Sequence, residues 1–186
     1  MEFKTDSRNL FFNVNVNQES ISHLTKKIVE INESDARTEA MIQAGILPFT
    51  FNRPPIKIYI DTYGGEVYPI LGLISLIESS KTPIHTICTG IAASAGFMLL
   101  ISGHKRFAHK YSTLMYHQLS SGTAGTLKEM EESIEQKAKL QSTLEAIVKE
   151  KTKISGKTLK ESFEKKIDLF YDVNQAIALG CIDEII

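Results

Sequence analysis

The chain has 186 residues, 42% of them hydrophobic, so it can bury a sizeable core and is expected to form one domain over residues 1–186. Its 21 basic and 22 acidic side chains nearly cancel and are interspersed, which argues against nucleic acid or an anionic membrane as a partner. No apolar run approaches the length of a membrane span, and residues 1–9 lack the apolar core of a secretory signal.

The two cysteines, Cys88 and Cys181, lie in apolar stretches without the spacing of a metal site. Such thiols are typical of the reduced core of a cytosolic protein, and a disulfide between them is the less favoured alternative. We therefore expect a soluble protein of the cytoplasm.

The first third of the chain is expected to hold one strand and one helix. Residues 11–16 alternate between apolar and polar side chains, which predicts a strand. Residues 19–32 carry apolar side chains at helical spacing, which predicts an amphipathic helix. Residues 34–55 are interpreted as an insertion or a hairpin, because three prolines interrupt any regular element there.

The middle of the chain repeats a strand, a turn and a helix. The first cycle predicts a strand over 56–60 and a helix over 67–77. The second predicts a strand over 84–88 and a buried helix over 97–101. This alternation favours an α/β fold with parallel strands and crossover helices.

Further strands and two helices are predicted in the second half. Short strands are expected over 105–108 and 113–116. Thr126 begins a capping box, so a long helix with one apolar seam is expected over about 126–150. The segment 174–179, which a glycine follows, predicts a short last helix.

A turn of small residues over 90–96 carries Ser94 between a predicted strand and a predicted helix. Free backbone N–H groups at a helix start can stabilise an oxyanion, so the Ala95 amide is a candidate donor. Gly65, in the Gly64-Gly65 turn after the preceding strand, is a candidate second donor because glycine lets the backbone approach a ligand. A purely structural serine turn and a tight glycine turn remain the alternatives.

A serine hydroxyl needs an adjacent base to act as a nucleophile at neutral pH, and histidine supplies one. His117 follows the apolar strand over 113–116 and precedes a flexible segment, so its ring could face a cleft. The other four histidines are interpreted as surface or packing residues: His23, His85, His104 and His109.

The third member of such a set is a carboxylate that orients the imidazole and stabilises the imidazolium. Asp168 is the candidate because it precedes an apolar segment and could be partly buried. Asp172 and Asp183 are interpreted as residues that flank helices.

Taken in order, four short motifs resemble those of the ClpP family of peptidases. They are IYIDTYGG (58–65), GIAASAG (90–96), MYHQ (115–118) and DLF (168–170), the last followed by GCID (180–183). The resemblance runs in register from about residue 56 to the carboxyl terminus and more loosely over 10–34. It implies a catalytic triad of Ser94, His117 and Asp168, with an oxyanion hole formed by the amides of Gly65 and Ala95.

The resemblance also implies an architecture and partners. The fold would be of the ClpP/crotonase type, with repeated strand-strand-helix units and a handle helix over about 126–150. Two stacked heptameric rings would enclose the active sites, and a Clp-family ATPase would deliver unfolded polypeptide. The chain lacks a GxxxxGK[ST] motif, so any use of ATP would belong to that partner. Neither a metal nor an organic cofactor is expected.

Some positions depart from the family pattern. Ala95 stands where a methionine is common, and only its backbone amide is needed. Ile167 occupies the place of an arginine that engages the second ring, so ring pairing could use other contacts. The segment 34–55 is longer than usual, and the first residues do not match the hydrophobic axial loops that meet the ATPase.

Four other functions are alternatives to a Clp-type peptidase. The first is a viral capsid-maturation peptidase with the same fold and chemistry. A catalytically silent ring subunit and a crotonase-type acyl-thioester enzyme are disfavoured by the full Ser/His/Asp set. A Ser–Lys peptidase is also disfavoured, because the histidine motif would then have no role in catalysis.

Overall fold

The computed structural model describes residues 7–186 of the chain, and every structural statement below concerns those residues. Its helices are α1 (Gln18–Gln43), α2 (Val67–Ser79), α3 (Ala95–Ile101), α4 (Leu127–Lys151), α5 (Gly156–Lys165) and α6 (Val173–Ala178). Its strands are β1 (Asn9–Phe12), β2 (Ile56–Thr62), β3 (Ile84–Ala93), β4 (Lys105–Ala108), β5 (Thr113–Tyr116), β6 (Leu169–Tyr171) and β7 (Glu184–Ile185).

The strands form one mixed sheet that is mostly parallel. The order is β1-β2-β3-β4-β7, and each of these neighbours pairs in parallel. The ten-residue strand β3 pairs with β4 along its first half and with β5 along its second half. Strand β6 then pairs antiparallel with β5. The long strand β3 therefore pairs with β4 in its first half, and its last residues lie beside β5, whose end is close to its own end.

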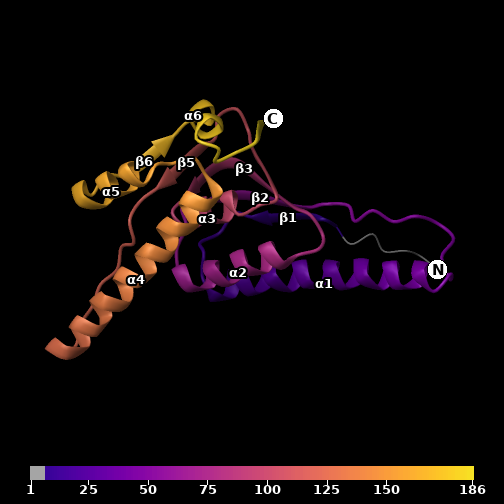
Figure 1. Cartoon of the computed structure of the whole chain (residues 1–186), viewed down its shortest axis with the longest axis horizontal. Coiled ribbons are helices and arrows are strands. Elements are labelled where there is room, and N and C mark those ends of the chain that lie inside the picture. The colour runs from indigo at the N-terminus through magenta and orange to yellow at the C-terminus, as the bar shows by residue number, and fades with distance from the viewer. Residues whose placement is uncertain (1–6) are drawn as a thin grey trace.

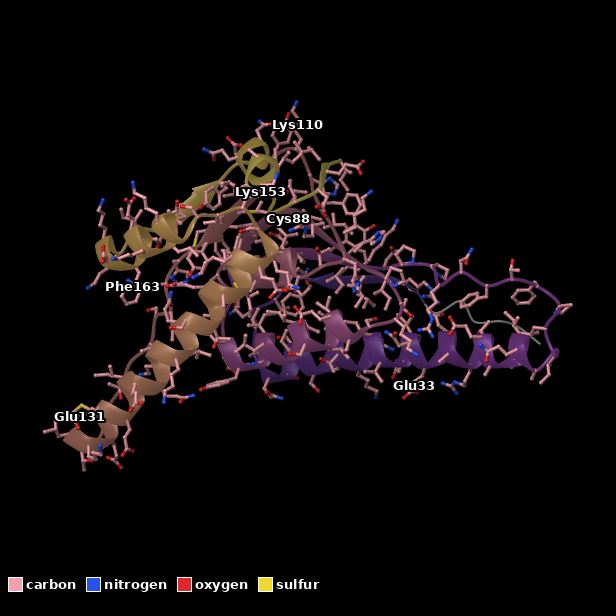
Figure 2. The ribbon with its side chains drawn as sticks, viewed as in Figure 1. Glu33, Cys88, Lys110, Glu131, Lys153 and Phe163 are labelled. Carbon is pink, nitrogen blue, oxygen red and sulfur yellow. The ribbon has the colours of Figure 1, made fainter. Side chains whose placement is uncertain are left out.

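The helices cover the sheet unequally (Figure 1). Helices α1 and α2 run side by side below the strands, and α3 is buried along its whole length at the centre. Helix α4 projects away from the body, with Glu131 near its far end (Figure 2). Alternating isoleucines of β2 pack against these helices and form the core: Ile56, Ile58 and Ile60 are fully buried. None of the described helices is both long and apolar enough to cross a membrane.

The prediction for the amino-terminal segment was partly wrong. Strand β1 ends at Phe12, and Val16 contributes only an isolated bridge to Gly65. Helix α1 continues past the predicted end at 32 to Gln43, and residues 44–55 return to β2 without a helix or strand. The helix persists because buried Asp35 accepts hydrogen bonds from Arg8 and from Thr82, which hold its second half against the body.

The small-residue turn is shorter than predicted. Residues 91–93 pair with β5 and extend β3, and α3 begins directly after Ser94, so Ser94 alone separates the strand from the helix. Helix α5, with Ser155 as its N-cap, and the strands β6 and β7 were not predicted. The predicted bounds of β4 and β5 are confirmed, as is the capping box that begins α4. Both cysteines are buried free thiols. The expectation for the first residues falls on 1–6, outside the described part.

Candidate active site

The backbone presents Ser94 at a sharp turn between β3 and α3. Its φ of 55° and ψ of −118° lie in a region that residues with a side chain rarely occupy, at a cost of about 1–3 kcal/mol. Two hydrogen bonds hold the strained residue: its N–H donates to the Met115 carbonyl at 2.9 Å, and its carbonyl accepts from the Met98 N–H at 3.1 Å. A strand-to-helix turn of this kind exposes the hydroxyl above the sheet, as in a nucleophile elbow.

The structure brings His117 to this serine. His117 directly follows β5, whose pairing with the last residues of β3 aligns the two strand ends. The His117 Nε2 lies 2.8 Å from the Ser94 Oγ, and both side chains are partly buried. When Nε2 carries no proton, it accepts the serine hydroxyl proton, which is the contact that a general base needs.

The Gly64-Gly65 turn lies against the serine turn. A Cβ on Gly64 would stand 2.6 Å from the Ala93 carbonyl oxygen and 2.8 Å from the Ala95 nitrogen, so the backbone fits only because glycine has none. The bridge to Val16 uses the Gly64 carbonyl and the Glu66 N–H, which leaves the Gly65 N–H out of it. The Ala95 N–H is in the first turn of α3, where amides lack an intrahelical partner.

Within residues 7–186, no hydrogen bond joins Asp168 to His117, and Asp168 is exposed. The two residues nevertheless follow the same end of the β5–β6 ladder. Tyr116 pairs with Leu169 as the last pair of this antiparallel ladder, and His117 and Asp168 each lie one residue beyond it. Ser162 fixes the preceding peptide, since its carbonyl and hydroxyl bond the Ile167 N–H and carbonyl at 3.0 and 2.7 Å.

The other four histidines have no hydrogen bond to Ser94 within the described chain. His104 Nδ1 accepts the Ile84 N–H at 2.9 Å, which is a packing role. The His85 ring packs against Phe107, and burial followed by the charge of Lys105 lowers its pKa. These observations agree with the interpretation of His85 and His104 as packing residues, and His23 and His109 are exposed.

Neither cysteine competes with Ser94 as a nucleophile. Burial raises the pKa of Cys88 to about 11 and that of Cys181 to about 12. A thiol reacts as the thiolate, so both groups are inert near neutral pH.

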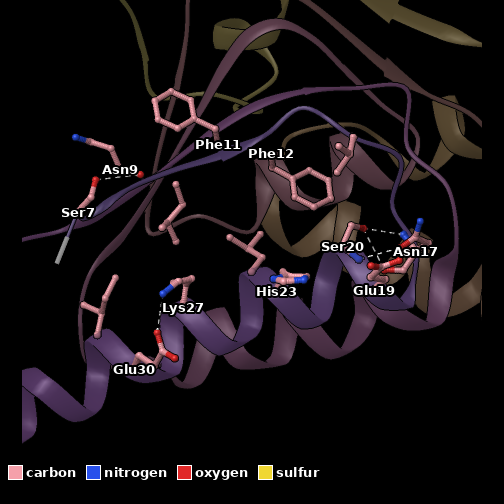
Figure 3. Close-up of a pocket in the computed structure, with 14 residues that line it drawn as sticks. Ser7, Asn9, Phe11, Phe12, Asn17, Glu19, Ser20, His23, Lys27 and Glu30 are labelled. Carbon is pink, nitrogen blue, oxygen red and sulfur yellow. Dashed lines mark hydrogen bonds and ion pairs between the residues drawn. The ribbon is translucent and has the colours of Figure 1, made fainter.

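A groove of about 1050 Å³ leads away from the glycine turn. It runs between the start of α2 and the side of α4, and its walls mix apolar with amide and hydroxyl groups, as a peptide requires: they include Gly65, Val67, Tyr68, Leu119, Ser121 and Leu140. A second groove, of about 720 Å³, lies between β1 and α1 (Figure 3). Phe12 and His23 line that second groove. Ser94 and His117 line neither groove, and the first groove meets the site at Gly64 and Gly65.

Two residues near the site were not predicted from the sequence. Thr62 accepts the Gly64 N–H at 3.1 Å and donates to the Val14 carbonyl at 2.6 Å, which shapes the glycine turn. No pattern in the sequence separates it from other strand threonines. Gln141 of α4 bonds the Leu119 N–H at 2.8 Å, two residues after His117. The sequence did carry a signal for Gln141, because it is a polar residue within the apolar seam of α4.

Comparisons with known proteins identify the family of this chain. The family model described as Clp protease matches residues 4–186. The ATP-dependent Clp protease proteolytic subunit of Deinococcus radiodurans is 33% identical over 156 residues, covering 83% of this chain and 76% of that protein. Proteolytic subunit 2 from Bacillus licheniformis is 35% identical over 137 residues, covering 73% and 71%. The mixed α/β fold with its parallel sheet is consistent with the ClpP type, and the chain belongs to the Clp protease family of serine peptidases.

Proposed function

We propose that this chain, as one domain, is the proteolytic subunit of a Clp-type compartment that hydrolyses peptide bonds of unfolded polypeptides. The observation that carries the proposal is the 2.8 Å contact between His117 Nε2 and Ser94 Oγ at a strained turn beside two glycines. A histidine and a serine in this contact perform acyl transfer in peptidases of unrelated folds.

The proposed reaction proceeds in two halves. The Ser94 oxygen attacks the peptide carbonyl carbon while His117 takes the hydroxyl proton, and the N–H groups of Gly65 and Ala95 stabilise the oxyanion. His117 then gives the proton to the amine nitrogen as the C–N bond breaks. Water repeats the sequence on the acyl-enzyme, so serine and histidine return to their starting states.

Asp168 is proposed as the residue that orients His117. The β5–β6 register and the hydrogen bonds with Ser162 support this role, because His117 and Asp168 each lie one residue beyond the last ladder pair and Ser162 holds the peptide before Asp168. Turning the side chain about this backbone would aim the carboxylate at the imidazole ring without refolding the strand.

Assembly and partners follow from the family and from exposed surfaces. We propose two stacked heptameric rings joined through α4, and a Clp-family ATPase that feeds them. The exposed apolar side chains of Leu127 and Ile134 on the projecting α4 support a partner subunit there. The compartment is proposed to be the cytoplasm, where buried thiols such as Cys88 stay reduced.

Peptide cleavage by single-residue variants tests the catalytic proposal. Ser94→Ala and His117→Ala should each lower kcat/KM for a fluorogenic peptide at least about 10³-fold, because each removes a group that acts in the chemical step. His109→Ala is the matched control, since His109 is exposed and its side chain is not part of the site.

The two outcomes are distinct. The proposal is supported if both site variants lose cleavage while the control keeps the wild-type rate. Cleavage at the wild-type rate by Ser94→Ala, with the protein free of other peptidases, would contradict it. A wild-type protein that assembles but cleaves no peptide would instead favour a catalytically silent ring subunit.

A further inference from the structure

Gln141 is a buried polar residue in an otherwise apolar seam of α4. The seam residues follow one another at spacings of three and four, and they include Ile134, Leu144 and Val148. Gln141 stands between Ile134 and Leu144 in this series and is only 8% exposed. Burying an amide is costly unless its hydrogen bonds are satisfied, so its partners indicate what it does.

Both ends of the Gln141 amide are bonded, and two of the three partners flank His117. Its Oε1 accepts the Leu119 backbone N–H at 2.8 Å, two residues after the histidine. Its Nε2 lies 3.4 Å from the Tyr116 hydroxyl, one residue before it. Nε2 also donates to Glu145 at 2.8 Å, which orients the amide. One side chain of α4 thus contacts the chain on both sides of the proposed base.

Tyr116 extends this connection to the helix that follows the serine. Its ring packs edge-on against Phe97 of α3, with centroids 5.9 Å apart. Burial raises the pKa of Tyr116 to about 12, so near neutral pH its hydroxyl remains a neutral acceptor for the Gln141 amide. The β5–β6 ladder ends at Tyr116, so the strand pairing that holds the tyrosine does not reach Leu119. The bond from Gln141 therefore fixes the chain where the sheet no longer does.

We propose that Gln141 is a positioning residue, which holds His117 at the distance from Ser94 that proton transfer requires. The inference rests on the proposed peptidase function and adds to it a dependence of the active site on α4. An error of about 1 Å in the placement of a catalytic group can cost about 100-fold in rate. Two hydrogen bonds to the residues on either side of the histidine therefore affect turnover strongly.

The test compares two seam variants. Gln141→Leu introduces an apolar side chain of similar size and removes both contacts around His117. Leu144→Ala is the matched control, because Leu144 lies buried in the same seam and its truncation removes packing without touching the histidine segment. For each variant we would measure kcat and KM on a short peptide, the labelling rate by a small fluorophosphonate, and Tm.

Gln141→Leu should lower kcat and the labelling rate about 10- to 100-fold, since the base is misplaced. KM should change less than kcat, since Leu119 is the only one of the named groove residues that loses a hydrogen bond to Gln141. Leu144→Ala should lower Tm while kcat stays within about threefold of wild type. Gln141→Glu combined with Glu145→Gln exchanges the amide and the carboxylate, keeps an acceptor for the Leu119 N–H, and should recover most of the lost rate.

The proposal is overturned if Gln141→Leu is labelled at the wild-type rate, or if its loss merely matches that of Leu144→Ala at an equal fall in Tm. Failure of the underlying function is a different result. In that case the wild-type protein itself would take up no fluorophosphonate, or Ser94→Ala would be labelled as fast as wild type.

Discussion

At the residue scale, the proposed chemistry depends on backbone positions that few residues tolerate. Ser94 has a positive φ although it carries a side chain, and its neighbours hold it there with two hydrogen bonds. Ser94, His117 and Gly65 could be singled out from the sequence because residue type and motif order identify them. Whether Asp168 would contact His117 could not be predicted, because a side-chain rotamer on an exposed segment has no signature in the sequence.

Gly64→Ala tests how closely the two turns pack. Gly64 has a φ of 100°, and an added Cβ would meet backbone atoms of residues 93 and 95 that cannot easily move. We expect a loss of about 2–3 kcal/mol in the free energy of unfolding, together with a loss of peptide cleavage. Denaturant titration and peptide kinetics check both effects.

The matched control is Gly72→Ala in α2. Gly72 is exposed within the helix, and a Cβ there would meet nothing within 4 Å. Alanine in a helix interior should stabilise the protein by about 0.5–1 kcal/mol and leave cleavage unchanged. Equal stability of the two variants would contradict the packing that we describe for Gly64.

At the scale of elements, the periodicity of apolar residues predicted the helices and strands whose buried side chains recur at regular spacing. The bounds of β4 and β5 and the cap of α4 were predicted because alternation and capping are local. The extension of α1 to Gln43 was not, because a distant ion pair with Arg8 supports it rather than an apolar stripe. Helix α5 was not predicted either, because it is short and mostly polar and so carries no long apolar stripe.

Asp35→Ala tests that account of α1. The Asp35 side chain is 2% exposed and accepts hydrogen bonds from Arg8 and from Thr82, so its removal takes the acceptor from a partly buried guanidinium and from a buried hydroxyl. We expect the free energy of unfolding to fall by about 2–3 kcal/mol. Urea titration followed by circular dichroism measures the change.

Glu33→Ala provides the comparison on the same helix. Glu33 points into solvent (Figure 2) and pairs with exposed Arg37, so its loss should cost less than about 0.5 kcal/mol. If both variants lose the same stability, the second half of α1 does not depend on the buried pair.

At the scale of the whole molecule, the fold class and family were predicted from the order of the motifs, and both are confirmed. The course of 44–55 was not predicted, because that segment has no periodic pattern. The assembly stays a prediction, since it depends on surfaces whose partners are other copies of the chain. Helix α4 is the surface that we propose for this assembly, because it projects from the body with apolar side chains exposed.

Ile134→Glu tests the role of α4 in assembly. Ile134 is 61% exposed on the projecting helix, and a charge there should oppose burial against a second ring. Native mass spectrometry should then show seven copies instead of the fourteen that we propose for wild type. Glu132→Lys, on the opposite side of the helix, removes only an exposed pair with Lys128 and should keep fourteen. Fourteen copies for Ile134→Glu would contradict ring pairing through this seam.

The most direct test of the central claim is to locate the adduct that a fluorophosphonate leaves on the wild-type protein. The contact between His117 and Ser94 predicts one adduct per chain, on the peptide that contains Ser94, and none after His117→Ala. An adduct on any other serine, with Ser94 unmodified while the protein cleaves peptides, would show that the nucleophile lies elsewhere.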